Sequence, residues 1–75
     1  MENKDSIVNF ISSTIEDSWV AYGKTLTPEE FLNICSQIMC QFDTDVAIQV
    51  FDKLSKSFGE IAKNESLSIK VNYGY

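Results

Sequence analysis

The chain has 75 residues, of which 11 are acidic and 6 are lysine, and it contains neither arginine nor histidine. A chain of this length is expected to form one domain with a small core. A net charge of −5 without arginine argues against direct binding to DNA or RNA. Proteins that bind nucleic acids need a basic surface and commonly use arginine for forked contacts to phosphate and guanine.

Two cysteines and no histidine exclude an ordinary tetrahedral zinc site and a framework of several disulfides. Cys35 and Cys40 fall on one predicted helix and point about 140° apart around it, so they cannot pair while that helix is intact. Unpaired thiols are typical of a reducing compartment. The sequence shows no apolar run of signal-peptide or membrane-spanning length. We therefore expect a cytoplasmic protein with no membrane partner.

The first helix is predicted over residues 6–22, with Asp5 or Ser6 as its N-cap. Gly23 follows at the position where a glycine in the left-handed conformation commonly closes a helix. Apolar side chains recur at steps of three and four residues and predict one buried face, which comprises Ile7, Phe10, Ile11, Ile15, Trp19 and Tyr22.

The second helix, over residues 28–42, has the most complete set of local signals. Thr27 is suited to the N-cap, Pro28 to the first helical position, and Glu30 to a capping box with Thr27. Leu26 and Phe31 have the spacing of a hydrophobic staple. The predicted buried face comprises Phe31, Ile34, Cys35, Ile38, Met39 and Phe42.

A third helix is predicted over residues 45–63, after a polar break at residues 43–45 that supplies a new cap. Gly59 falls on the polar side of this helix and is expected to weaken it modestly. The broad apolar face comprises Val46, Ala47, Val50, Phe51, Leu54, Phe58, Ile61 and Ala62.

Residues 65–75 break the helical period. Apolar and polar side chains alternate from Leu67 to Tyr73, as in a half-buried strand. No other segment resembles a partner strand, so this one would be solvated, pack on the helices, or pair with another chain. We favour pairing with a second copy or with a target's sheet edge. On that interpretation, truncation after Asn64 leaves the helices formed and abolishes association.

The sequence therefore predicts a mainly all-α single domain over residues 1–75. Its expected architecture is a three-helix antiparallel bundle with an extended, strand-like C-terminal tail.

No group of residues indicates catalysis. Histidine, the commonest general acid–base residue, is absent, and the paired carboxylates lie at helix starts or on a solvated face. We expect no enzymatic activity, no cofactor and no metal site.

Apolar residues outside the predicted core are the strongest functional signal. They lie at the edges of the helical faces or on the predicted strand, and comprise Val20, Cys40, Ile48, Leu67, Ile69, Val71 and Tyr73. Such a surface is typical of contact with another protein. We expect a non-catalytic interaction module that acts as a regulator, inhibitor or accessory chaperone, and forms a homodimer. The alternative is an acidic mimic of nucleic acid that occupies the basic groove of a nucleic-acid-binding protein.

Overall fold

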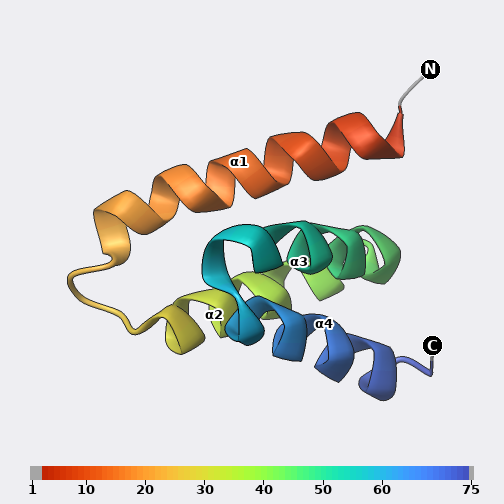
Figure 1. Ribbon diagram of the computed structural model, residues 1–75. Helices are drawn as coiled ribbons and strands as arrows, with labels where there is room; N and C mark the ends of the chain where they lie inside the picture. Colours follow the sequence, from red (N-terminus) through yellow and green to blue (C-terminus); the bar gives the residue numbers. More distant parts are fainter. Residues whose placement is uncertain (1–2, 75) are drawn as a thin grey trace.

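Every regular element within residues 3–74, the range that the computed structural model describes, is a helix. The four helices are α1 (Lys4–Tyr22), α2 (Pro28–Cys40), α3 (Thr44–Phe58) and α4 (Glu60–Asn72), and consecutive helices run in alternating directions (Figure 1). The predicted mainly all-α class is confirmed. The predicted number of helices and the strand-like tail are wrong, because residues 60–72 form a fourth helix.

The central helix of the fold is α3, and it is the most completely buried. Ala47, Val50, Phe51 and Leu54 on this helix are fully buried. α3 packs against each of the other three helices, whereas α1 and α4 lie on opposite sides of it, and their described backbones do not approach each other closely (Figure 1). The core is therefore built around α3.

The start of α2 has the predicted capping box. Thr27 Oγ1 accepts a hydrogen bond from the Glu30 amide at 3.1 Å, and Glu30 Oε1 accepts one from the Thr27 amide at 3.0 Å. The hydrogen bond from the Thr27 amide, with a smaller contribution from the Thr27 side chain, lowers the pKa of Glu30 by stabilising its charged form. Local sequence chemistry thus determines where α2 begins.

The caps of the other helices agree only in part with the prediction. Asp43 caps α3, as the polar break suggests, by accepting a hydrogen bond from the Val46 amide at 3.1 Å. The cap of α1 is Asn3 and not Asp5 or Ser6, and Asn3 Oδ1 accepts from the Asp5 amide at 2.9 Å. Asp5 lies in the first turn, where its negative charge interacts favourably with the helix dipole.

Gly23 closes α1 for a different reason from the one predicted. Its φ of −65° is right-handed, so the prediction of a left-handed glycine is wrong. A Cβ at this position would lie 3.0 Å from the carbonyl oxygen of Trp19 and 3.2 Å from the Trp19 indole. Glycine therefore allows the indole to lie close against the backbone at the end of α1.

Gly59 divides the predicted third helix in two. Its φ of 65° and ψ of −136° interrupt the helical backbone between Phe58 and Glu60, and the chain turns back to pack α4 against α3. This conformation is open to glycine and strongly disfavoured for other residues. Gly59 is thus a chain-reversal position and not a weak point within one helix.

Residues 60–72 satisfy their own backbone groups as a helix, which a lone strand could not do. The buried positions of α4 are Ala62, Ser66 and Ile69, which follow the helical spacing of four and three residues. Ser66 Oγ donates a hydrogen bond to Asp52 Oδ1 of α3 at 2.6 Å. Burial of small and polar side chains explains why the apolar pattern alone did not reveal this helix.

Candidate interaction surfaces

One side of α2 carries apolar side chains that the fold leaves exposed. Ile34, Ile38 and Phe42 are spaced four residues apart, which places them along one side of α2 and just beyond its end. About half of the Ile34 and Ile38 surface is exposed, and Phe42 is 83% exposed. Their prediction as core residues is wrong. α2 packs against both α3 and α4. The side of α2 that is buried is therefore the one that carries Leu32 and Ser36.

α1 contributes further apolar side chains beside the Phe42 end of this row. Ile7 and Ile11 of α1 line an apolar groove of about 290 Å³ together with Met39 and Phe42 at the end of α2. Phe10, three residues after Ile7 and next to Ile11, is 72% exposed. We call the combined surface the α1–α2 face, and it comprises Ile7, Phe10, Ile11, Ile34, Ile38, Met39 and Phe42.

The α1–α2 face coincides with the two uncharged stretches of the chain. No charged residue occurs between Asp5 and Glu16 on α1, or between Glu30 and Asp43 on α2. After Glu30, the exposed polar residues of α2 are the amides Asn33 and Gln37, and Gln37 donates a hydrogen bond to Asn33 at 2.7 Å. Depletion of charge around exposed apolar side chains distinguishes the centre of a protein interface from ordinary surface.

Charged groups border this face at the end where α1 begins. Lys4 at the start of α1 forms an ion pair with Asp45 at the start of α3, and Asp43 lies at the edge of the groove. An apolar centre with a polar border is the common anatomy of a protein–protein interface.

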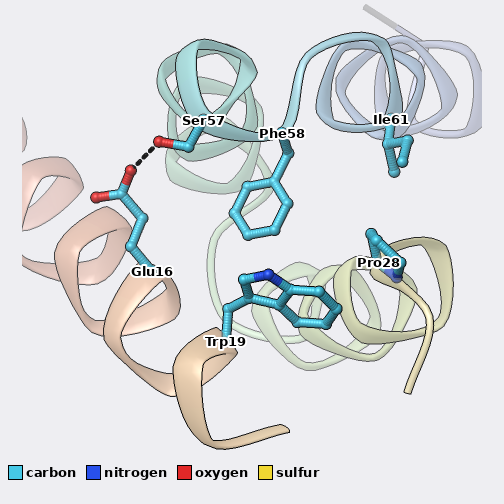
Figure 2. Close-up of a pocket in the computed structure, with 6 residues that line it drawn as sticks. All are labelled: Glu16, Trp19, Pro28, Ser57, Phe58 and Ile61. Atoms are coloured by element: carbon cyan, nitrogen blue, oxygen red, sulfur yellow. Dashed lines mark hydrogen bonds between the residues drawn. The ribbon is translucent and has the colours of Figure 1, made fainter. Parts of the chain in front are cut away.

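A second hollow lies near the opposite end of α1 and has an aromatic lining. This cleft of about 370 Å³ lies between α1, the start of α2, and the junction of α3 with α4. Figure 2 shows Trp19 and Phe58 side by side at its centre, with Glu16 and Ser57 on one side and Pro28 and Ile61 on the other. Ser57 Oγ donates a hydrogen bond to the Glu16 carboxylate across the gap between α3 and α1.

The aromatic rings that line this cleft pack against each other and against the buried Phe31 ring. The Trp19 ring centroid lies 5.2 Å from that of Phe31 and 5.9 Å from that of Phe58, which it meets edge to face. Phe31 is buried, whereas Trp19 and Phe58 are partly exposed. The buried Phe31 ring contacts both Trp19 and Phe58, and these contacts hold the two partly exposed rings in place.

The predicted partner-binding residues do not form one surface. Ile48 and Ile69 are buried, at 6% and 3% exposure, so their side chains belong to the core. Cys40 is partly buried and packs against that core. The exposed residues of the set lie on α1 and on or just after α4, and comprise Val20, Leu67, Val71 and Tyr73. The helical backbone places Leu67 and Val71 on one side of α4 and Ile69 on another.

Both cysteines are free and partly buried. Burial raises the pKa of the Cys35 thiol, because the charged thiolate is poorly solvated there. The protonated form is therefore favoured at Cys35, which is unfavourable for a nucleophile or a metal ligand.

The sequence analysis does not single out the α1–α2 face, because the helical period places all of its residues in the predicted core. A helical period identifies apolar side chains that share a side, and it does not tell whether this chain or another chain covers them. The available signal was the absence of charge over both stretches, since the exposed side of a solvated helix usually carries charged groups.

Within residues 3–74, no three histidine, cysteine, aspartate or glutamate side chains lie close enough together to hold a metal ion. None of the four described helices is sufficiently long and apolar to cross a membrane. Comparison of the chain with protein-family models, curated proteins and solved structures gave no match.

Proposed function

We propose that the protein is a non-catalytic interaction module that forms a homodimer through the α1–α2 face, in the role of a regulator, inhibitor or accessory chaperone. The observation that carries this proposal is an exposed apolar surface that coincides with the uncharged stretches of α1 and α2. Burial of this surface in a dimer removes its exposed aromatic and aliphatic side chains from water.

A second copy of the chain fits the charge pattern of the face better than a basic partner does. The face offers no carboxylate at its centre to select a basic surface, although the whole chain carries a net charge of −5. Two copies with equal negative charge repel each other least when they meet through uncharged surfaces. The side-chain amides of Asn33 and Gln37 each carry a donor and an acceptor, so they can pair with their counterparts across a two-fold axis.

Mimicry of nucleic acid is less well supported. A mimic needs carboxylates gathered on one surface, whereas several acidic groups here have internal partners. Asp43 caps a helix, Asp45 pairs with Lys4, and Asp52 accepts from Ser66. These internal partners favour an interaction module over a mimic of nucleic acid.

The experiment compares two single substitutions by sedimentation equilibrium. Phe42→Asp places a charge in the α1–α2 face, and Val71→Asp places the same charge on an equally exposed apolar position of α4. Both positions are about 80% exposed, so neither change disturbs the core. We expect the parent chain and Val71→Asp to be dimers and Phe42→Asp to be a monomer. A monomeric parent chain would exclude this interface. So would a result in which Val71→Asp dissociates the dimer and Phe42→Asp does not.

A further inference from the structure

We infer that the cleft around Trp19 and Phe58 is a binding site for an arginine side chain of a protein partner. The cleft lies near the C-terminal end of α1 and the start of α2, whereas the groove of the α1–α2 face lies near the start of α1 and the end of α2. The inference goes beyond the proposed dimer and does not depend on it.

The lining of the cleft combines two features that a guanidinium group recognises. Trp19 and Phe58 present partly exposed aromatic rings, and the electron-rich face of an aromatic ring attracts a cation. Glu16 supplies a carboxylate beside these rings (Figure 2). Arginine suits this combination because its planar group stacks on an aromatic ring and also forms forked hydrogen bonds to a carboxylate.

The carboxylate of Glu16 is held in position without being neutralised. The Ser57 hydroxyl, which is uncharged, donates a hydrogen bond to this carboxylate. The ion pair within the described residues joins Lys4 and Asp45 and does not involve Glu16. Ser57 therefore orients one carboxylate oxygen and leaves the negative charge available to a cation from outside the chain.

The electrostatic surroundings of the cleft favour a basic ligand. Residues next to the lining residues in the sequence include Asp17, Glu29 and Glu60, against one lysine, Lys56. All lie on the helices that form the cleft. Together with the net charge of −5, these groups are expected to attract a basic segment before it docks.

A polypeptide side chain fits the shape of the site. The cleft opens between exposed Glu16 and Ser57 on one side and the starts of α2 and α4 on the other. A segment that crosses this junction can insert one side chain between the helices while its backbone stays at the surface. The aliphatic part of arginine then lies against Pro28 and Ile61, and its guanidinium group reaches Glu16.

Trp19 is the sole tryptophan of the chain, so its fluorescence reports directly on the occupancy of the cleft. The probe is the blocked tripeptide acetyl-Gly-Arg-Gly-amide, and the matched control replaces arginine with citrulline, which has nearly the same shape and no charge. We expect saturable binding of the arginine peptide in the millimolar range, weaker binding of a lysine counterpart, and little response to the citrulline peptide.

Two variants test the carboxylate. Glu16→Gln removes the charge and retains an oxygen that can accept from Ser57, whereas Asp17→Asn makes the same change in net charge outside the cleft lining. We expect Glu16→Gln to weaken binding of the arginine peptide roughly two- to fivefold, the range for one partly exposed ion pair, and Asp17→Asn to have little effect. Equal binding of the arginine and citrulline peptides, or equal effects of the two variants, would overturn the assignment.

The same titration with Phe42→Asp separates this inference from the proposed dimer. We expect the arginine peptide to bind this variant as it binds the parent chain, because Phe42 is outside the cleft lining. Loss of dimerisation with retained binding leaves the cleft assignment intact. Retained dimerisation without binding of the arginine peptide overturns the cleft assignment alone.

Discussion

Buried serines are the least expected residues in this small core. Ser12, Ser36 and Ser66 are buried among apolar side chains. Ser66 donates to Asp52, which links α4 to α3, whereas the buried Ser12 Oγ has no hydrogen-bond partner. A buried hydroxyl without a partner loses its hydrogen bonds to water and receives nothing in return. The two residues therefore affect stability in opposite directions.

Replacement of each serine by alanine tests this difference. Ser12→Ala removes an unsatisfied hydroxyl and improves helix propensity, so we expect the free energy of unfolding to rise by about 1 kcal/mol. Ser66→Ala removes the hydrogen bond to Asp52, and we expect a decrease of about 1 kcal/mol. Urea denaturation followed by circular dichroism measures both changes. A shift of both variants in the same direction would contradict this account of the two hydroxyls.

At the scale of the helices, the junction of α3 and α4 was the feature that could least be predicted. Phe58, Ile61 and Ala62 continue the helical spacing across Gly59, so periodicity alone favours one uninterrupted helix. A single glycine is also tolerated within a helix at a cost of about 1 kcal/mol. Nothing in the local pattern shows that the chain reverses there. By contrast, the capping box at Thr27 was predictable because its residues interact within four positions of one another.

The Gly59 backbone gives a prediction at this scale. A Cβ on Gly59 would meet no atom within 4 Å, so the effect of Gly59→Ala arises from the backbone conformation and not from a clash. We expect a loss of about 1–3 kcal/mol in the free energy of unfolding, measured by thermal and urea denaturation. Gly74 also has a positive φ, of 76°, but it follows the last helix, where the backbone can relax. Gly74→Ala is thus the matched control, and an equal loss in both variants would argue against a specific role for the Gly59 turn.

At the scale of the whole molecule, the sequence predicts which segments form amphipathic helices better than it predicts which side of each helix packs against the others. Phe51 and Leu54 are buried as expected because α3 is surrounded by the other helices. α4, which was not predicted, packs against α2, so the buried side of α2 is the one that carries Leu32. Ile38 and Phe42 lie on another side and are exposed. Tertiary arrangement therefore decided the candidate interface, and the local pattern could not. The charge-free stretches were the part of that interface visible in the sequence.

The same reasoning reverses the expectation for truncation after Asn64. As a strand, the removed segment would contribute to association and leave the helices intact. As the greater part of α4, it contains Ser66 and Ile69, and its loss exposes the side of α3 against which α4 packs. Removal of one large apolar core side chain typically costs about 2–5 kcal/mol, which approaches the stability of a domain this small.

We therefore expect the chain truncated after Asn64 to be largely unfolded, with most of its helical circular dichroism and its cooperative thermal transition lost. Truncation after Asn72 is the matched control, because it leaves α4 and all the buried residues in place. That shorter truncation is expected to melt close to the parent chain, since Tyr73 is exposed and lies beyond the helix. A cooperative, fully helical protein after truncation at Asn64 would show that α1, α2 and α3 form a stable core without α4. The dependence of the core on α4 would then be excluded.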